Sequence, residues 1–193
     1  MEMIMKASEN PSAIQSRKRI IEALIDLMQI KKLEDISISE ITENADVVRR
    51  TFYRHFKSKE DVLDSYFNSL LNEFKAGLNE DDRKIDCMYS IRIILNLCYV
   101  NKRLFTALAK SRMLNYMLEK WTDVLPEIHQ QILDRIVNFP DIQNEEVLGY
   151  LLAFNSGGIY NIVLKWVKEG MTKTPDEICN IVEKFAFGSL MVK

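Results

Sequence analysis

A short basic stretch, residues 49–59, carries the side chains best suited to contact a polyanion. It reads Arg-Arg-Thr-Phe-Tyr-Arg-His-Phe-Lys-Ser-Lys, with five cationic residues, interleaved aromatic residues and no acid. The whole chain has a formal net charge of -2, so these cations form a local cluster. Cations at the start of a short helix that follows a helix and a tight turn indicate a helix-turn-helix protein that contacts DNA. The alternative interpretation is a solvated basic helix end, since charge runs usually face water.

Catalysis and metal binding find little support in the sequence. Its two histidines are His55, inside the basic stretch, and His129, in a polar segment expected to face solvent. The sequence contains no Gly-rich phosphate loop, nucleophile elbow or His-Glu-x-x-His motif. Cys87 and Cys98, if on one helix, lie roughly 16 Å apart along its axis, too far for one ion. We therefore predict no catalytic residue, no metal and no cofactor, and an all-α enzyme is only a distant third hypothesis.

Composition favours an all-α protein. Hydrophobic residues make up 47% of 193 residues, glycine and proline are few at 6 and 4, and the apolar segments have helical spacing. The three cysteines are odd in number and widely spaced, which argues for a reducing compartment. The first residues do not have the pattern of a signal peptide, and no apolar run reaches about 18 residues. We expect a cytoplasmic protein without a membrane span.

The elements needed to position the basic stretch can be read from helical spacing and capping signals. A first helix is expected from about 12 to 29, with its apolar face formed by Ile14, Ile21, Leu24, Ile25 and Met28. Ser37 and Glu40 have the spacing of a capping box that starts a second helix through residue 44, with Ile38 and Ile41 inward. A turn at 45–47 leads to a third helix at about 48–55.

A fourth helix at about 59–78 is expected to bridge a head and a body. The polar segment 79–83 follows it, and further helices are predicted at roughly 84–99, 102–109, 111–136, 145–168 and 175–190. Pro126 and Pro140 should kink or end elements. Thr174, Pro175 and Glu177 form a good helix start. The predicted domains are 12–60 and 61–193.

Residues 17–63 resemble the DNA-binding head of TetR-type regulators. The resemblance rests on three runs: Ile38-Ser39-Glu40-Ile41, then Thr51-Phe52-Tyr53-Arg54-His55-Phe56, then Lys57-Ser58-Lys59-Glu60-Asp61-Val62-Leu63. Residues 154–178 are similar, more weakly, to the last helices of a Firmicutes-type TetR C-terminal domain. Asp46, Val48 and Arg50 replace the usual Gly, Ser and Gly of the family. Asp46 can still form a turn, whereas Val48 has no hydroxyl with which to cap the third helix.

The DNA-binding residues follow from position and from the resemblance. Arg50 and Thr51 are the expected base readers, because Arg can bond guanine and the Thr methyl can touch thymine. The resemblance implies phosphate contacts for Tyr53, His55 and Lys59. Phe52 and Phe56 should pack the core of the head. The remaining candidates, for phosphate or groove contact, are Arg17, Lys18, Ser37, Ser39, Arg49, Arg54 and Lys57; the two serines are as readily explained as capping residues.

For the C-terminal domain, residues 61–193, we predict a dimer interface and an effector-binding site. The resemblance implies that the last two helices pair across a two-fold axis, and an apolar stripe with small residues supports this. The expected interface is Leu148, Leu151, Asn155, Gly158, Ile159, Ile162, Trp166, Ile178, Ile181 and Phe185. The resemblance also implies an inducer site in the middle helices, where methionine and aromatic residues suit an adaptable pocket. The candidates are Met88, Tyr89, Arg92, Leu95, Tyr99, Phe105, Met113, Met117, Trp121 and Phe154.

These observations predict a homodimeric, sequence-specific regulator that binds a palindromic operator in double-stranded DNA. We expect a repressor that a small apolar effector releases from the operator. The alternative is a TetR-like co-activator or adaptor that acts through a protein partner, and the altered turn at Asp46, Val48 and Arg50 is the reason to retain it.

Overall fold

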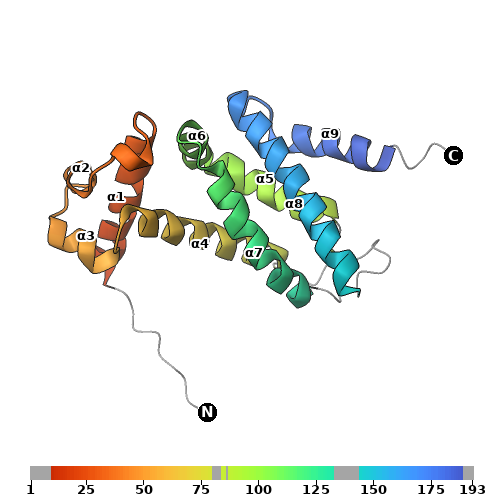
Figure 1. The fold of residues 1–193 in the computed structure, drawn as a ribbon, viewed down its shortest axis with the longest axis horizontal. Helices are drawn as coiled ribbons and strands as arrows, with labels where there is room; N and C mark the ends of the chain where they lie inside the picture. Colours follow the sequence, from red (N-terminus) through yellow and green to blue (C-terminus); the bar gives the residue numbers. More distant parts are fainter. Residues whose placement is uncertain (1–9, 80–83, 86, 133–143, 189–193) are drawn as a thin grey trace, which may run out of the picture. The chain divides into compact units, whose positions relative to one another are not determined.

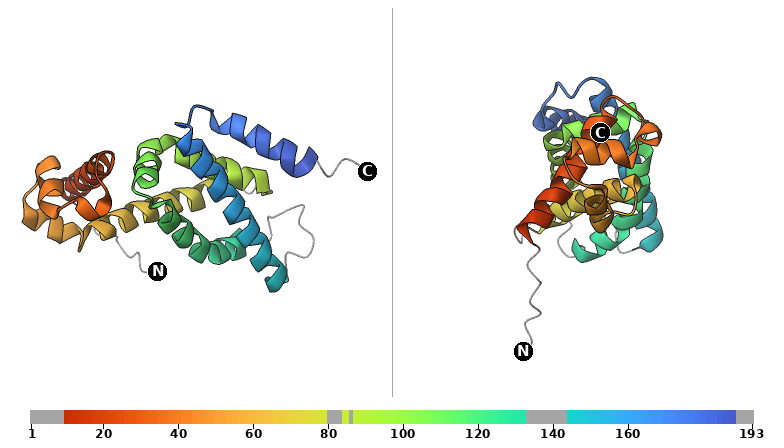
Figure 2. Two further views of the ribbon diagram at one scale, coloured as in Figure 1. Left: turned by 45° about the horizontal axis from the view of Figure 1, so that its top comes forward. Right: turned by 90° about the vertical axis from the view of Figure 1, so that its left-hand side faces the viewer.

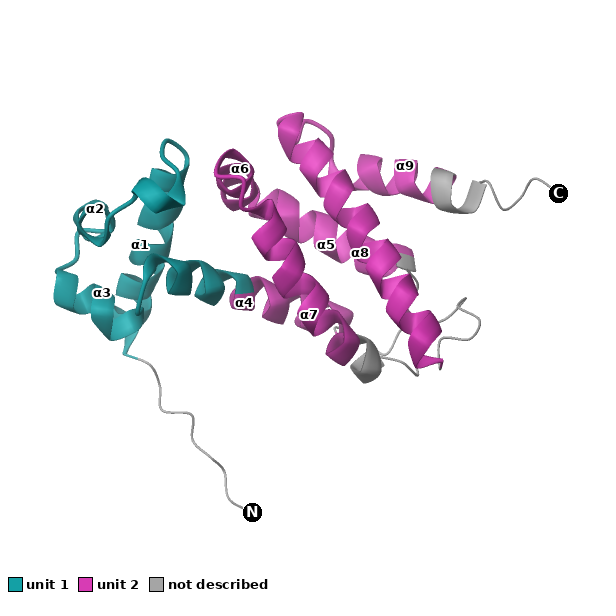
Figure 3. Ribbon diagram, viewed as in Figure 1, with its two compact units in different colours: residues 1–67 teal, residues 68–193 magenta. Residues whose placement is uncertain are grey.

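The computed structural model describes residues 10–79, 84–85, 87–132 and 144–188. Within these residues the regular elements are α-helices and one short 3-10 helix, which confirms the predicted all-α class (Figure 1). The chain divides into two compact units, residues 1–67 and 68–193 (Figure 3). The border between them falls within helix α4, Lys59–Leu78.

The first unit contains four elements before α4. They are α1 (Pro11–Met28), η1 (Leu33–Asp35), α2 (Ile38–Asn44) and α3 (Arg49–His55). Helix α1 begins where the side chain of Asn10 accepts a hydrogen bond from the Ser12 amide at 3.0 Å, with a proline in the first position. The core of the unit consists of fully or almost fully buried apolar side chains: Ile20, Leu24, Met28, Ile41, Phe52, Phe56 and Val62.

Two predictions about this core need correction. Ile14 is 51% exposed, so it does not belong to the buried face of α1, which begins at Ile20. Helical periodicity predicts which residues share a side of the helix, but it does not show how far along the helix that side is covered. Ile38 is only half-buried, and Ile36, just before the helix, is buried together with Ile41.

The second unit comprises the rest of α4 and five further helices. These are α5 (Cys87–Val100), α6 (Lys102–Lys110), α7 (Leu114–Ile132), α8 (Glu145–Lys168) and α9 (Pro175–Gly188). Helix α8 packs along α7 and α6, and α9 packs on α5 (Figure 2). Pro126 lies inside α7 and does not end it, in agreement with the helix predicted across this residue at 111–136. A helix can tolerate the loss of one backbone hydrogen bond when packing holds its two halves. Pro140 lies outside the described residues.

Local signals explain how α8 and α9 begin and end. The side chain of Asn144 accepts hydrogen bonds from the second and third amides of α8. Gly170, with φ of 76°, takes the left-handed conformation that ends this helix. The predicted start of α9 is confirmed: Thr174 Oγ1 accepts from the Glu177 amide at 3.3 Å, and the Glu177 carboxylate accepts from the Thr174 amide at 2.7 Å.

Helix α8 is the one described helix that is long and apolar enough to cross a membrane, judged by length and composition alone. This finding does not overturn the expectation that no membrane span is present, because Asn155, Ser156 and Asn161 interrupt the apolar residues of the helix. Only a minor part of the helix is buried within its own chain. A helix that packs against others in a protein core can have the same length and composition, and α8 packs against α6 and α7.

Candidate nucleic-acid interface

The turn that leads into α3 takes the shape that Asp46 permits. Asp46 has φ of 48°, the left-handed region that aspartate tolerates better than most residues, as predicted. The amide of Val47 donates to the carbonyl of Thr42 at 3.0 Å, which closes the end of α2. Arg19 of α1 forms an ion pair with Asp46 at 2.6 Å. An acidic residue in place of glycine thus gains a partner that holds the turn against α1.

Helix α3 separates a buried aromatic side from an exposed basic side. Phe52 and Phe56 are buried, with ring centroids 6.0 Å apart, which confirms their predicted role in the core. Thr51 and His55 are half-buried at the edges of this side. The side chains that face water are those of Arg49, Arg50, Tyr53 and Arg54. The fold therefore presents a cationic surface on a helix whose orientation is fixed by two phenylalanines.

Arg49 and Tyr53 form a pair one turn apart on the exposed side. The guanidinium lies over the ring, 5.7 Å from its centroid, and its Nη2 donates to the Tyr53 hydroxyl at 3.4 Å. Arg50 differs, because among the described residues none accepts a hydrogen bond or ion pair from its guanidinium. Arg49 is thus oriented before any ligand arrives, whereas the donors of Arg50 remain available.

Residues of α1 that were expected to reach phosphate are partly engaged inside the unit. Arg17 donates to Ser65 Oγ of α4 at 2.6 Å and lies 5.7 Å from the centre of the Phe56 ring. Lys18 pairs with Glu22 along the same helix at 3.8 Å. Both cations keep a solvent-exposed side chain, so a flanking contact with phosphate stays a prediction for each.

His55 is joined to α1 across 39 residues of sequence. Its Nε2 lies 2.8 Å from Ser16 Oγ, and that hydroxyl also donates to the Ala13 carbonyl at 3.0 Å. Since the serine proton is used on the carbonyl, the serine oxygen accepts from Nε2–H of the histidine. His55 therefore fixes α3 to α1. Ser16 was missed by the sequence reasoning, and no local motif could have indicated it.

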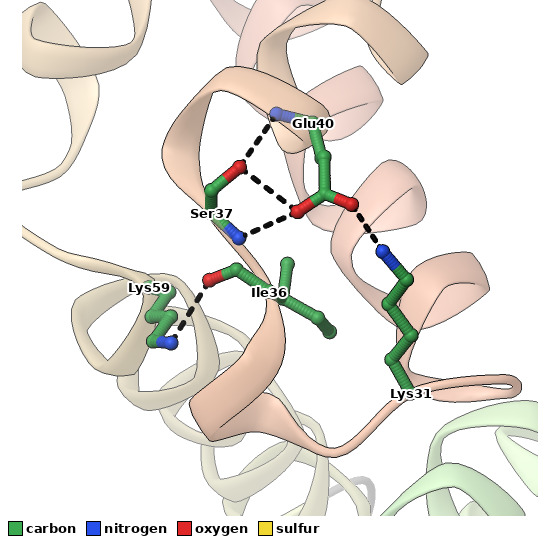
Figure 4. Close-up of polar contacts among 5 residues, drawn as sticks. All are labelled: Lys31, Ile36, Ser37, Glu40 and Lys59. Carbon is green, nitrogen blue, oxygen red and sulfur yellow. Dashed lines mark hydrogen bonds and ion pairs between the residues drawn. The ribbon is translucent and has the colours of Figure 1, made fainter.

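Ser37 and Glu40 form the predicted capping box at the start of α2 (Figure 4). Ser37 Oγ accepts from the Glu40 amide at 3.2 Å and donates to the Glu40 carboxylate at 2.9 Å. Lys31 forms an ion pair with the same carboxylate. The bond from Lys31, followed by the backbone and side-chain bonds from Ser37, lowers the pKa of Glu40 from 4.5 to about 2. The Ser37 hydroxyl is therefore committed to the cap, while Ser39 stays exposed.

Lys59, for which the resemblance implied a phosphate contact, forms hydrogen bonds within its own unit. Its Nζ donates to the carbonyls of Leu33, Glu34 (3.0 Å) and Ile36 (2.9 Å), which surround the 3-10 helix before α2. Figure 4 shows the bond to Ile36. An ammonium has three protons, and all three are used here. In the structure without DNA, Lys59 thus acts as a clasp that holds the η1–α2 connection on the first turn of α4, and the phosphate contact stays a prediction.

The predicted pocket residues in the second unit fall into three groups. Met88, Leu95 and Phe105 are buried, whereas Tyr89, Arg92, Met113, Met117 and Trp121 are half-buried. Tyr99 is partly exposed and its ring stacks on that of Trp166 at 5.9 Å. Phe154 must be removed from the set, because its side chain is 78% exposed.

Several of these side chains already have partners within the unit. Arg92 of α5 forms an ion pair with Asp176 of α9. Trp121 packs on Phe74 with ring centroids 4.7 Å apart, and the Tyr89 hydroxyl donates to the Gly77 carbonyl at 3.0 Å. Cys98 is fully buried, and burial raises the pKa of its thiol. Among the described residues, no group of histidine, cysteine and acidic side chains could hold a metal ion.

The predicted dimer residues also divide by exposure. Trp166 and Ile178 are buried within their own chain and so belong to its core. Five residues are half-buried: Leu148, Leu151, Asn155, Ile159 and Ile162. Gly158 and Ile181 are exposed, and the side chain of Phe185 lies outside the described residues. The most exposed apolar side chains of α8 are Val147, Tyr150 and Phe154, which were not among the residues of the predicted interface.

Comparisons with known proteins agree with this architecture. The pattern of bacterial regulatory proteins of the tetR family matches residues 20–66, and that of a transcriptional regulator C-terminal region matches residues 88–188. The dhaKLM operon transcriptional activator DhaS of Lactococcus lactis is 25% identical over 175 residues, which cover 88% of this chain and 90% of the relative.

Two solved structures share the fold. The fatty acid degradation regulator FadR of Bacillus halodurans has a TM-score of 0.64 at 18% identity, with 97% of this chain and 100% of that chain covered. The transcriptional regulator FadR of Bacillus subtilis, in complex with stearoyl-CoA, has a TM-score of 0.62 at 20% identity, with 86% and 94% covered. With one family pattern on the first unit and another on more than half of the chain, this protein belongs to the TetR family of bacterial transcriptional regulators.

Proposed function

We propose that this regulator binds a palindromic operator as a homodimer and inserts α3 of each protomer into the major groove. The observation that carries the proposal is the division of α3 into a buried aromatic side and an exposed side of three arginines and a tyrosine. Recognition helices of helix-turn-helix proteins contact base edges through their first residues. Among the first residues of α3, Arg50 and Thr51 are the proposed base readers.

Some side chains of α3 are suited to contact bases and others to contact phosphates. Arg50, whose donors have no partner within the described residues, can form two hydrogen bonds to a guanine, and the Thr51 methyl can contact a thymine. The oriented Arg49–Tyr53 pair suits a phosphate, since both groups donate from one side of the helix. Lys57 and Arg54 add charge along the backbone. Affinity should therefore fall steeply as the salt concentration rises.

The second protomer would cover the exposed side of α8. Val147, Tyr150, Phe154, Gly158 and Asn161 recur at intervals of three or four residues and so share one side of this helix. Tyr150 and Phe154 are 74% and 78% exposed. A Cβ added at Gly157 or Gly158 would meet no atom within 4 Å, so a partner helix can approach closely there. We favour this surface over a membrane because α8 buries Trp166 and Val163 on its other side.

We further propose that a small apolar effector binds the second unit and releases the protein from its operator. The middle helices offer buried Met88, Leu95 and Phe105, and the similar FadR structure holds stearoyl-CoA. One described polar atom, Ser111 Oγ at the end of α6, is buried without a hydrogen-bond partner and could orient a ligand. The effector must prefer one of two dimer geometries, because equal affinity for both would shift nothing.

A second function is activation through a protein partner. Its support is the similarity to DhaS over 88% of this chain, since that relative is a transcriptional activator. The altered turn, with Val48 in place of a capping residue, points the same way. Under this alternative the isolated dimer would bind DNA weakly and without sequence preference.

The experiment that tests the proposal is selection of bound duplexes from a random DNA pool by the purified protein at two salt concentrations. A recovered palindrome with half-sites about 34–36 Å apart, or a multiple of this, would support a dimeric DNA reader. Release of that duplex by stearoyl-CoA, used as the first probe because its acyl chain is apolar, would support the repressor mechanism. Effector binding that leaves DNA affinity unchanged would refute the mechanism, and the absence of enrichment would favour the partner-dependent alternative.

A further inference from the structure

Val48 is an exposed apolar side chain at the tip of the DNA-binding helix. It is 69% exposed and lies directly before Arg49 and Arg50, which are exposed as well. Its carbonyl accepts hydrogen bonds from the amides of Thr51 (2.8 Å) and Phe52 (3.4 Å), so its backbone is fixed to the first turn of α3. A β-branched side chain on a fixed backbone has few rotamers. The two methyl groups are therefore held in place ahead of the helix.

This position works against the stability of α3. Val48 is the N-cap residue, in extended conformation with φ of -77° and ψ of 149°, and it makes no capping hydrogen bond through its side chain. A serine there would bond an amide of the first turn, so the valine deprives α3 of a stabilising cap. The valine also exposes apolar surface to water. Residues that break a local rule without a gain in stability are expected at functional sites.

We propose that Val48 reads the C5 methyl group of a thymine in each half-site. This contact between Val48 and thymine rests on the proposed placement of α3 in the major groove. Valine has no hydrogen-bond donor or acceptor, so it cannot read the polar groups of base edges. The apolar group that bases present in the major groove is the thymine methyl. A rigid isopropyl group beside two arginines would then add contact at an A·T pair next to the guanine that Arg50 reads.

Deoxyuridine, which lacks this methyl group, gives a direct test. In the duplex selected by the full-length protein, each thymine of one half-site is replaced in turn by deoxyuridine and the dissociation constant is measured. We expect a position at which binding weakens about fourfold, the effect of removing one buried methyl group, and at which this penalty depends on Val48. A thymine contacted by the Thr51 methyl would be a second, separate position. Val48→Ala should abolish most of that penalty and leave the other positions unchanged. As a control, Thr51→Ser removes the neighbouring methyl group and keeps the hydroxyl, so the penalty assigned to Val48 should persist.

Three outcomes would overturn the assignment. The wild-type protein could tolerate deoxyuridine everywhere, Val48→Ala could keep the full penalty, or Thr51→Ser could remove it. Because Val48 is exposed, its replacement by alanine should not unfold the protein, and a thermal unfolding curve verifies this. If the random pool yields no enriched duplex, the proposed DNA reading itself fails and the thymine contact falls with it. An enriched duplex without a methyl effect overturns the contact alone.

Discussion

Replacing Lys59 with methionine should destabilise the DNA-binding unit more than it changes the charge of the DNA-binding surface. The ammonium donates to three backbone carbonyls, and the bonds to Leu33 and Ile36 are partly buried. Methionine keeps much of the side-chain length but donates no hydrogen bond. The 3-10 helix and the start of α2 would then lose the group that holds them on α4.

The magnitude follows from the two partly buried bonds. Bonds to charged donors are worth about 1.5–3 kcal/mol, but Lys59 is half-buried and water can reach the freed carbonyls in part. We therefore count about 1 kcal/mol for each, or about 2 kcal/mol in the free energy of unfolding. For a chain of this size, that corresponds to a lowering of the melting temperature by about 4–8 °C. Thermal unfolding followed by circular dichroism measures the shift.

Lys57→Met is the matched control. Lys57 is exposed, and its backbone amide donates a hydrogen bond to the Asp61 carboxylate at 2.7 Å. A methionine at this position keeps that backbone hydrogen bond. Surface changes of this kind usually alter stability by less than about 0.5 kcal/mol. In DNA binding, Lys57→Met should make the slope of the logarithm of the binding constant against the logarithm of the salt concentration less steep by about one, as expected for the loss of one phosphate contact. If Lys59→Met shows that reduction and an unchanged melting temperature, Lys59 is a phosphate contact and the clasp is refuted.

Three further predictions concern the cap, the dimer and base reading. The lowered pKa of Glu40 means that its carboxylate stabilises the fold above pH 4.5 and that this contribution is lost as pH falls from 4.5 towards 2. The difference in the free energy of unfolding between wild type and Glu40→Gln, measured by urea unfolding, should therefore shrink over that range. A difference that stays constant with pH would contradict this. Phe154→Asp should shift the protein to monomers in size-exclusion chromatography at concentrations where wild type is dimeric, because the substitution would bury a charge in the interface. A dimer that persists in this variant would place the interface elsewhere. Arg50→Ala should relax the preference at particular base pairs by about 1–3 kcal/mol in binding free energy, whereas equal loss on random duplexes would make Arg50 a phosphate contact.

Features set by neighbouring residues in the chain could be predicted from the sequence. The Ser37–Glu40 box, the Thr174–Glu177 helix start and the pairing of Phe52 with Phe56 depend on spacings of three or four residues. The left-handed turn at Asp46 followed in the same way from the conformational tolerance of aspartate. Each of these is a local rule, and the structure confirms them.

Contacts between distant segments could not be predicted in this way. Lys59 bonds carbonyls that precede it by 23 to 26 residues, and His55 bonds Ser16 across 39. A flexible lysine at the start of a helix has the same sequence signal whether its ammonium meets a phosphate or a carbonyl. The resemblance to a family indicated a phosphate contact for Lys59, whereas the hydrogen bonds to the backbone carbonyls could be seen only in the structure of this chain.

Helix α8 shows why apolar content alone could not assign its two sides. The helix is apolar almost all round, so its sequence does not distinguish the side that packs within the chain from the side that awaits a partner. Trp166, the larger aromatic residue, is buried, while Phe154 is not. A side chain of phenylalanine size loses about 1.5–3 kcal/mol of stabilisation when it stays in water. Tyr150 lies one turn away, and Gly157 and Gly158 beyond it have open space around them, so this exposed apolar surface is concentrated on one side of α8. A second copy of the same helix can supply the cover that the described residues do not give it.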